Sequence, residues 1–396
     1  MPAELSDRLT DLYVIDTDSH WTEPFDLWTS RAPARYADDV PRTRINAKGD
    51  PEFVFAGEPT FGAAFSYVRK DGSKTRMADI GLAMPMDEMH PASFDPIARL
   101  ALMDEMGIYA QLIYPNVLGF LAPVLCQRVE RDLAYAVVAI YNDACAEMQE
   151  ESRGRLFPQA VLPFWNITDA IKEAERVKGL GLRGVTMPGS PDMGGLPDLG
   201  TPHWDPLFAV LSDLGLPINI HVGSANHDAT EEWTQAWPSL PRREADSVNT
   251  VAPELANSRF ITNLIMSDIV QRWPDLKWVS VESGIGWIPY VLERVDYSYR
   301  EELPGVEPPD RLPALDQFRR NVYATFWFEN TARFAIDYLG TDNVMWETDF
   351  PHPTCLYPSP VERTLDALEG LSEEAIRKVM QDNAADLYSI PLPATS

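Results

Sequence analysis

Eight short apolar segments, separated by helical patterns, constrain the fold of this chain more than any other feature of its sequence. Most of them are continuous apolar runs, which are typical of parallel strands buried on both faces. The predicted strands are residues 13–18, 110–114, 159–163, 184–187, 217–221, 277–282, 322–325 and 344–349. The predicted helices are residues 132–150, 169–178, 206–214, 258–272, 332–338, 360–368 and 373–380. This alternation predicts an α/β protein whose parallel strands close into a (β/α)8 barrel.

The whole chain of 396 residues is predicted to form a single domain, 1–396. Its 34 prolines and 22 glycines are spread along the sequence rather than gathered in one linker, so no domain boundary is apparent. Two connections are long. Residues 22–104, after the first strand, are expected to pack as a lid or small subdomain. Residues 223–251 are expected to shape a pocket or to form an oligomer contact.

Composition narrows the class of partner. The formal net charge is −27, from 33 Lys and Arg against 60 Asp and Glu, and nucleic acid or an anionic membrane surface would repel such a chain. Three scattered cysteines are too few for a disulfide framework or a cysteine zinc site. The first residues lack the basic start and apolar core of a signal peptide, and no continuous apolar span is present. We therefore expect a cytoplasmic protein that binds a small molecule.

Acidic residues and histidines recur where predicted strands end. In an α/β barrel, active-site residues project from the carboxyl ends of the strands. Asp18 and His20 are two residues apart on the first strand, so they face the same side and could bind one ion. The candidate ligands at four strand ends are Asp18, His20, His221, Glu282, Asp349 and His352. Histidine and carboxylate together suit Zn, Mn or Fe, so the sequence predicts a divalent metal centre.

Each of these motifs alone has an ordinary structural explanation. An Asp-x-His pair is most often a helix cap beside a surface histidine, and Glu282 could be half of an ion pair. Their coincidence at four strand ends favours the metal centre. A serine-nucleophile hydrolase is disfavoured, because the chain contains no Gly-x-Ser-x-Gly motif.

Six segments carry a family resemblance. In chain order they are DTDSHWTEPFDLW, SFDPIARLALMDEMGI, LPINIHVG, VESGIGWIPYVLERVD, WETDFPHP and DNAADLY. As an ordered set, from about Tyr13 to Tyr388, they resemble the amidohydrolase-related family. This branch of the amidohydrolase superfamily includes aminocarboxymuconate-semialdehyde decarboxylase and the resorcylate-type decarboxylases. The resemblance implies a distorted TIM barrel, a divalent metal at its mouth and, commonly, a homodimer.

The resemblance also implies roles for individual residues. The His-x-His of the family's first strand falls on Asp18 and His20, so its first histidine is a carboxylate here. The fifth-strand histidine ligand matches His221, and the eighth-strand aspartate that binds metal and orients water matches Asp349. Glu282 stands where many decarboxylases keep a histidine acid/base. We therefore expect Asp349 and Glu282 to be catalytic, and the other three residues to join Asp349 around one ion.

The chemistry stays open among three interpretations. The first is a metal-dependent decarboxylase (a C–C lyase) or hydrolase acting on a small, carboxylated organic substrate. The second is a dinuclear Fe or Fe/Mn oxygenase, because the six candidate ligands could hold two ions with Glu282 or Asp18 bridging them. The third is a catalytically inactive scaffold subunit. The expected cofactor is Zn, Mn or Fe in one or two copies, and the expected assembly is a homodimer or a hetero-oligomer with a related chain.

Three residues near strand ends or starts are candidate substrate contacts, namely Arg183, Trp165 and Asn116. An anionic substrate would need positive charge beside a carboxylate-rich ion, and an arginine would grip its carboxylate with two hydrogen bonds. Arg99 and Arg69, from the long first connection, could serve the same purpose. The alternative for Arg183 is a structural ion pair.

Overall fold

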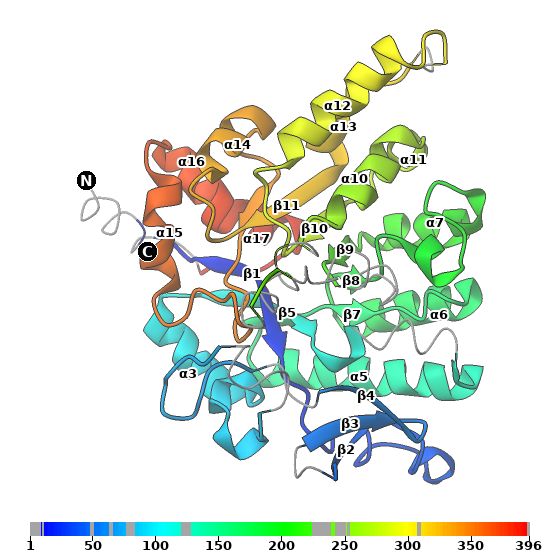
Figure 1. The fold of residues 1–396 in the computed structure, drawn as a ribbon, viewed down its shortest axis with the longest axis vertical. Coiled ribbons are helices and arrows are strands. Elements are labelled where there is room, and N and C mark those ends of the chain that lie inside the picture. Colours follow the sequence, from blue (N-terminus) through cyan, green and yellow to red (C-terminus); the bar gives the residue numbers. More distant parts are fainter. Residues whose placement is uncertain are drawn as a thin grey trace.

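The barrel strands form the centre of the computed structural model (Figure 1). The structure describes residues 9, 12–47, 51–62, 66–76, 84–119, 128–223, 239–241, 251, 254–306 and 310–393. The barrel strands are β1 (Ile15–Trp21), β5 (Ala110–Pro115), β6 (Leu156–Pro158), β7 (Ala160–Val161), β8 (Val185–Thr186), β9 (Ile218–His221), β10 (Trp278–Val281), β11 (Val322–Phe326) and β12 (Val344–Trp346). All eight predicted strands are therefore confirmed; the third, 159–163, coincides with β7, and β6 precedes it as a strand that was not predicted.

The strands lie in two parallel sheets that follow one another around the barrel. One sheet has the order β1-β5-β6 and the other the order β12-β11-β10-β9-β8-β7. The sheets join where the chain passes from β6 to β7. Gln159 N donates to Ile113 O at 2.8 Å on one side of this junction, and Ala160 N donates to Gly184 O at 3.0 Å on the other.

The second junction brings β1 against the segment that follows β12. His20 N donates to Phe350 O at 2.6 Å, and Asp349 N donates to Asp18 O at 2.8 Å. These contacts close the ring of strands, as the predicted barrel requires. They also bring Asp18 and His20 beside Asp349, so three of the four bonded residues are candidate ligands.

Helices surround the barrel on its outside (Figure 1). They are α3 (Pro96–Met106), α5 (Arg131–Glu151), α6 (Ile167–Gly179), α7 (Asp205–Leu214), α10 (Asn257–Met266), α11 (Ile269–Arg272), α12 (Ile288–Glu301), α13 (Ala314–Asn321), α14 (Ala332–Leu339), α15 (Pro360–Leu368), α16 (Glu373–Arg377) and α17 (Asn383–Leu387). Every predicted helix is present, with 258–272 divided into α10 and α11, and α3, α12, α13 and α17 add to them. Among the described residues, no helix combines the length and the apolar character needed to cross a membrane.

The long connection after β1 contains a small antiparallel sheet of its own. Its strands are β2 (Arg42–Ile45), β3 (Pro51–Phe55) and β4 (Glu58–Gly62), in that order. The predicted connection ended at residue 104 and so included most of α3. That helix begins at the Asp95 cap, whose side chain accepts from Ala98 N, and it leads directly into β5. We therefore assign α3 to the barrel's own helical layer. Most of the other long connection, 223–251, lies outside the described residues.

Polar side chains inside the barrel form a hydrogen-bonded floor beneath the strand ends. Asn219 donates to Gln159 Oε1 at 2.8 Å and to Val185 O at 2.9 Å, and it accepts from the hydroxyl of Tyr114 at 3.0 Å. The Tyr114 ring lies 5.1 Å from the His221 ring. Because these buried polar groups find partners, the floor is rigid and holds the residues above it in place.

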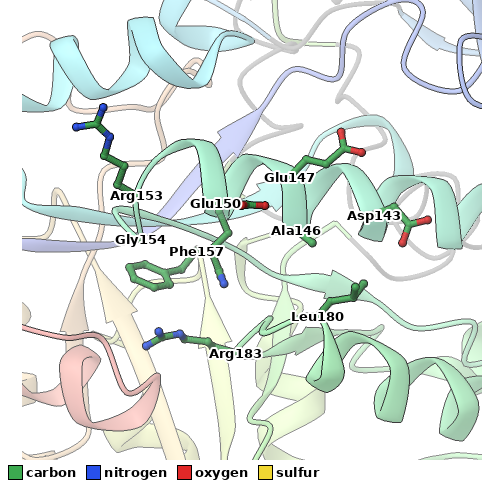
Figure 2. A pocket seen from close by; sticks show the side chains of 10 residues that line it. Asp143, Ala146, Glu147, Glu150, Arg153, Gly154, Phe157, Leu180 and Arg183 are labelled. Carbon is green, nitrogen blue, oxygen red and sulfur yellow. The ribbon is translucent and has the colours of Figure 1, made fainter.

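The amino ends of the strands carry a groove of about 740 Å³ (Figure 2). It lies between α5 and the starts of β6 and β8, and Arg183 forms part of its wall. Arg183 donates to the carbonyl oxygens of Tyr388 and Ser389, and its guanidinium lies 4.8 Å from the centre of the Phe157 ring. Arg183 thus lies at the end of the barrel opposite to the candidate ligands, because it begins a strand, and this placement does not support the expectation that it contacts the substrate.

Candidate metal centre

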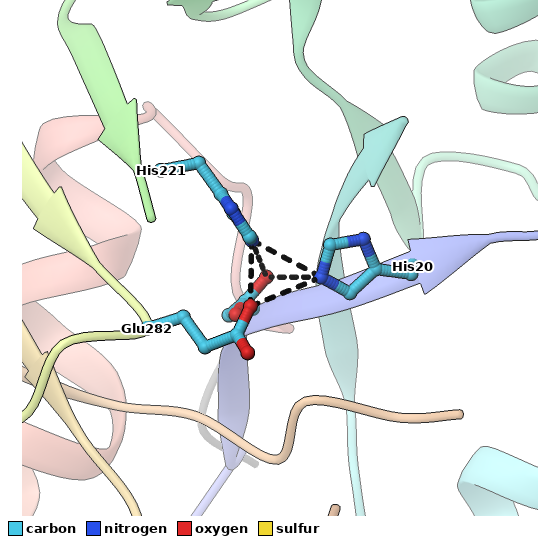
Figure 3. Close-up of side chains that lie close together, drawn as sticks. His20, His221 and Glu282 are labelled. Carbon is cyan, nitrogen blue, oxygen red and sulfur yellow. Dashed lines mark hydrogen bonds and ion pairs between the residues drawn. The ribbon is translucent and has the colours of Figure 1, made fainter. Parts of the chain in front are cut away.

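Four strand ends bring the candidate ligands together at the carboxyl end of the barrel. Asp18 and His20 belong to β1, His221 is the last residue of β9, and Glu282 follows β10 directly. Asp349 follows β12 by three residues and precedes His352. Figure 3 shows the side chains of His20, His221 and Glu282 converging from three different strands.

The first group of four donors consists of Asp18, His20, His221 and Glu282. His20 Nε2 lies 3.5 Å from Asp18 Oδ1 and 3.5 Å from Glu282 Oε2. His221 Nε2 lies 3.6 Å from Asp18 Oδ1, 3.0 Å from Glu282 Oε2 and 3.1 Å from His20 Nε2. Donors at about 2.1 Å from one ion are about 3.4 Å apart in a tetrahedral shell. These separations therefore match the ligand shell of a single divalent ion.

The second group shares two donors with the first and consists of His20, Glu282, Asp349 and His352. It is less regular. His352 Nδ1 lies 2.7 Å from Asp349 Oδ1 but 3.9 Å from Glu282 Oε2, and His20 Nε2 lies 3.7 Å from Asp349 Oδ1. The rings of His20 and His352 stack with centroids 3.7 Å apart. We call the first group of four donors the compact shell. The sequence predicted Asp349 as its fourth member, but Glu282 takes that place, and Asp349 pairs with His352.

The backbone is strained at two of the candidate ligands. Glu282 has φ of 53° and Asp349 has φ of 59°, a left-handed conformation that non-glycine residues rarely adopt. Such strain is kept only where the surrounding structure enforces it, and it gathers at functional sites. Here both strained residues contribute carboxylate oxygens to the groups of candidate donors.

Asp16 fixes the positions of the two strands that carry most of the ligands. Its carboxylate accepts from Thr348 N at 2.8 Å, from Thr348 Oγ1 at 2.6 Å, from Gln111 Nε2 at 2.7 Å and from Asp18 N at 3.2 Å. It thereby connects β1, β5 and the segment after β12. Burial nevertheless raises the pKa of Asp16 to about 7, although these hydrogen bonds oppose the rise.

Crowding of buried charge shifts the pKa values of the ligands in opposite directions. Burial raises the pKa of Asp18 to about 8 and that of Asp349 to about 6. Burial opposes ionisation of Glu282 as well, but hydrogen bonds with His20 and His221 hold its pKa below the ordinary value. Burial lowers the pKa of His20, whereas Asp18 raises that of His221 in spite of burial. Without a cation, the cluster must therefore share protons among carboxylates and imidazoles.

Several buried atoms of the cluster have no hydrogen-bond partner among the described residues. They are both carboxylate oxygens of Asp18 and the Nδ1 atom of His20. An unpartnered buried carboxylate oxygen is costly unless it is protonated or binds a cation. His221 Nδ1 donates to Val222 O at 2.7 Å, which leaves Nε2 with a lone pair toward the other donors. These residues fit a divalent metal ion.

The other two predicted substrate contacts, Asn116 and Trp165, lie in different surroundings. Asn116 follows β5, is fully buried and hydrogen-bonds to His352 Nε2 at 2.8 Å. Trp165 follows β7, and its ring contacts Phe164. Its role toward a substrate stays a prediction.

The two arginines of the first connection have structural partners. Arg99 is buried, donates to His20 O at 2.6 Å and lies 4.5 Å from the centre of the Phe350 ring. Arg69 pairs with Glu88 at 2.8 Å. Arg99 therefore supports the backbone that carries His20, and the expectation that either arginine grips the substrate is not supported by these contacts.

Four further residues near the centre were not singled out from the sequence. Glu347 is buried; its Oε2 accepts from Glu282 N at 3.3 Å, while its Oε1 has no partner among the described residues. Thr354 donates to Asp349 Oδ2. Glu254 and Glu329 add negative charge, and burial raises the pKa of Glu254 to about 8. Only Glu347 gave a signal in the sequence, because it stands at the end of a predicted strand.

Comparisons with known proteins agree with this geometry. The family model described as Amidohydrolase matches residues 15–390. An amidohydrolase from Mycobacterium avium subsp. paratuberculosis superposes with a TM-score of 0.74 at 22% identity, covering 96% of this chain and 99% of that chain. 5-Carboxyvanillate decarboxylase from Sphingomonas paucimobilis gives 0.63 at 22% identity, with 96% and 100% covered.

A third similar solved structure contains a bound metal ion. Dihydroxybenzoic acid decarboxylase from Polaromonas, solved with bound manganese and the inhibitor 2-nitroresorcinol, gives a TM-score of 0.62 at 19% identity and covers 96% of this chain and 97% of that chain. The search of curated proteins gave no match. The similarity to the solved structures supports the fold, and the family model matches nearly the full length of the chain. The chain therefore belongs to the amidohydrolase family.

Proposed function

We propose that this protein is a metal-dependent decarboxylase of small, carboxylated organic molecules. The observation that carries the proposal is the buried first group of donors, whose separations of 3.0–3.6 Å match one divalent ion. Two of the similar solved structures are decarboxylases of carboxylated aromatic compounds, and one of these holds manganese. Mn is consistent with a shell in which carboxylate oxygens equal imidazole nitrogens in number.

Asp18, His20, His221 and Glu282 would hold the ion, which when bound supplies a Lewis acid that orients an anionic substrate. Asp349 and His352 stand beside this shell as an acid–base pair, with Nδ1 and Oδ1 2.7 Å apart. Asp349 raises the pKa of His352 in spite of burial, which favours a proton held between the two side chains. That proton would pass to the carbon from which the carboxylate leaves as carbon dioxide.

Charge balance supports a carboxylated substrate at this site. Asp18, Glu282 and Asp349 carry three negative charges, of which one divalent ion cancels two. A protonated His352 cancels the third. The substrate carboxylate then meets a neutral centre rather than an anionic one, and no arginine is needed beside it.

A second candidate function rests on the second group of donors. Because His20, Glu282, Asp349 and His352 also lie within 4.8 Å of one another, a second ion could bind there with the Glu282 carboxylate shared between the two. Two Fe or Fe/Mn ions would then favour oxygenase chemistry. A protein that retains no metal would instead fit the inactive scaffold subunit. Assembly as a homodimer or with a related chain stays a prediction in each case.

The test is carbon dioxide release by protein loaded with Mn²⁺, Zn²⁺ or Fe²⁺. The first substrates to try are dihydroxybenzoic acids and 5-carboxyvanillate, beside their amides. We expect release from the acids, loss of release in His221→Ala, and unchanged release in His203→Ala, which removes an exposed histidine outside the centre. Metal-loaded protein that hydrolyses the amides but leaves the acids intact would contradict the decarboxylase proposal, and oxygen consumption with two bound ions would favour the oxygenase.

A further inference from the structure

The turn that carries Glu282 is held by a carboxylate from the neighbouring strand. Glu282 follows β10 directly, and the turn continues to α12, which begins at Ile288. Glu329 lies three residues beyond the end of β11, the strand that pairs with β10 in parallel. Its Oε1 accepts from Ile285 N at 2.8 Å and from Gly286 N at 3.0 Å. One carboxylate thus joins the loops that follow two adjacent strands at the carboxyl end of the barrel.

The turn fits against this carboxylate because residue 284 has no side chain. Gly284 has φ of 65°, a left-handed conformation that glycine adopts freely. A Cβ atom there would lie 2.7 Å from Glu329 Oε1 and 2.9 Å from Glu329 Oε2, closer than non-bonded atoms approach one another. A Cβ atom at Gly286 would lie 2.9 Å from Thr331 Oγ1. The turn and the loop after β11 are therefore in direct contact, and a shift of one must displace the other.

The beginning of the same turn is anchored to β11 as well. Glu282 N donates to Thr325 Oγ1 at 3.1 Å, and Thr325 belongs to β11. Glu282 lies between this anchor and the contacts of Glu329, and its φ is 53°. Because that conformation is unfavourable for any residue other than glycine, it persists only where contacts on both sides enforce it. Glu329 supplies the contacts on the carboxyl-terminal side.

We propose that Glu329 is a positioning residue that holds the turn 282–286, so that the Glu282 carboxylate lies within the compact shell. The inference rests on the proposed metal centre and deepens it, because it names the contact that makes Glu282 a donor. Neither group of candidate donors includes Glu329. It acts through the acceptor atom Oε1 rather than through its charge. Outer partners of this kind typically change metal affinity by about 10- to 100-fold when they are removed.

The first experiment titrates metal-free protein with Mn²⁺ by calorimetry. We expect Glu329→Leu, which leaves two backbone N–H groups without their acceptor, to weaken binding by about 10- to 100-fold. Glu329→Gln removes the charge but keeps Oε1 as an acceptor, so its affinity should stay within about threefold of wild type. Unchanged binding in Glu329→Leu would overturn the inference. Equal losses in the two variants would also overturn it, because the charge would then explain the effect.

The matched control is Asp296→Leu, which removes another carboxylate that accepts from a backbone N–H. Asp296 lies on α12 in the outer helical layer, and its carboxylate accepts from Ala314 N at 3.1 Å. This variant should lose stability and bind Mn²⁺ as wild type does. If Asp296→Leu weakened Mn²⁺ binding as much as Glu329→Leu, the loss would reflect general destabilisation, and the inference would be overturned.

The second experiment asks whether Glu329 acts through Glu282. The Mn²⁺ affinity of Glu329→Leu, Glu282→Ala and the double variant is compared with that of wild type. If Glu329 acts only by positioning Glu282, its replacement has no further effect once the Glu282 carboxylate is gone. Two losses that multiply in the double variant would overturn the inference and leave the proposed function in place.

Gly284→Ala provides the same test where Glu329→Leu does not fold. The added Cβ would displace the Glu329 carboxylate from the turn, so Mn²⁺ affinity should fall by about 10- to 100-fold. Gly284→Ala protein that binds Mn²⁺ as wild type does would overturn the inference. Wild-type protein that binds no Mn²⁺, Fe²⁺ or Zn²⁺ would overturn the proposed function, and this inference with it.

Discussion

Charged side chains lie at both ends of the barrel, but they differ in burial and in their hydrogen-bond partners. At the carboxyl ends, Asp18 is fully buried, and neither of its carboxylate oxygens has a hydrogen-bond partner among the described residues. At the amino ends, Arg183 donates to two backbone carbonyls, and Glu147 on the groove wall pairs with Arg31 at 2.8 Å in contact with solvent. Charge alone therefore does not mark the site. Burial without partners does, because folding leaves such atoms unsatisfied only where a ligand or proton compensates.

Backbone geometry alone does not separate the two ends. Glu282 and Asp349 adopt positive φ at the carboxyl ends. At the amino ends, Gly154 and Gly181 take the positive φ angles of 72° and 87° in turns beside the groove, where glycine adopts them freely. Arg153 on the groove wall (φ 56°) and Ser389 (φ 52°) are strained in the same way, so positive φ marks the site only where it coincides with buried carboxylates.

The largest expected effect comes from removing a ligand of the compact shell. Replacing His221 with alanine removes one of four donors and leaves Asp18 and Glu282 facing each other. We expect metal affinity to fall by more than about 100-fold, which exceeds the effect of losing an outer partner. Metal content after dialysis, measured by plasma mass spectrometry, checks this. The matched control is His203→Ala, and equal metal content in the two variants would break the comparison.

Metal removal is expected to cost stability in a pH-dependent way. The folded metal-free protein raises the pKa of Asp18 to about 8 and of Asp349 to about 6, from 3.8. It therefore binds protons more tightly than the unfolded chain does, and its stability falls as the pH rises from about 4 to about 8. A bound cation replaces these protons. Mn²⁺ at about 1,000 times its Kd should add about 4 kcal/mol of stability.

The sign of this effect is measured by thermal melting with and without Mn²⁺. The gain in Tm on adding metal should be larger at pH 8 than at pH 6, because the metal-free form has lost stability between them. A gain in Tm that becomes smaller as the pH rises would show that the carboxylates are already ionised without metal. Electrostatics would then not distinguish the two ends of the barrel.

Asp16→Asn should have an intermediate effect. The new amide group would face donors that the carboxylate now accepts from, including Thr348 N and Gln111 Nε2. Leaving buried donors unsatisfied costs about 1–3 kcal/mol, and the shift of β1 against the segment after β12 should also weaken metal binding. Urea unfolding of metal-free protein measures the first effect, and Mn²⁺ titration measures the second. Lost stability with unaltered metal affinity would mean that Asp16 supports the fold only.

The smallest effect is expected from Arg183→Met at the amino end. The half-buried side chain would lose hydrogen bonds to the C-terminal segment, each worth about 1 kcal/mol. Metal content should be unchanged, and so should the KM for acid and amide substrates. Weaker binding of the acid alone would restore Arg183 as a substrate contact and contradict its position in the structure.

The sequence predicted the barrel because parallel strands buried on both faces leave continuous apolar runs that need no long-range information. It predicted which residues gather at the carboxyl ends for a related reason, since the ends of successive parallel strands share one face. The position of Arg183 was readable as well: a residue that starts a strand points to the other end, and this outweighs its chemical suitability for a carboxylate.

The distribution of donors within the centre could not be predicted in this way. Glu282 enters the compact shell because its backbone turns to positive φ, and a single sequence gives no sign of that turn. The pairing of His352 with Asn116 depends on how β5, β1 and the segment after β12 meet, a contact between residues 236 positions apart. Spacing along the chain supplies the ligand types, and tertiary packing decides which of them share an ion.

Metal stoichiometry of the wild-type protein tests the central claim most directly. Protein prepared without chelator and dialysed against metal-free buffer would be measured by plasma mass spectrometry beside His221→Ala and Arg183→Met. The account predicts at least one divalent ion per chain in wild type, the same content in Arg183→Met and little metal in His221→Ala. Wild-type protein that retains no stoichiometric metal, and does not bind Mn²⁺, Fe²⁺ or Zn²⁺ when they are added, would contradict it.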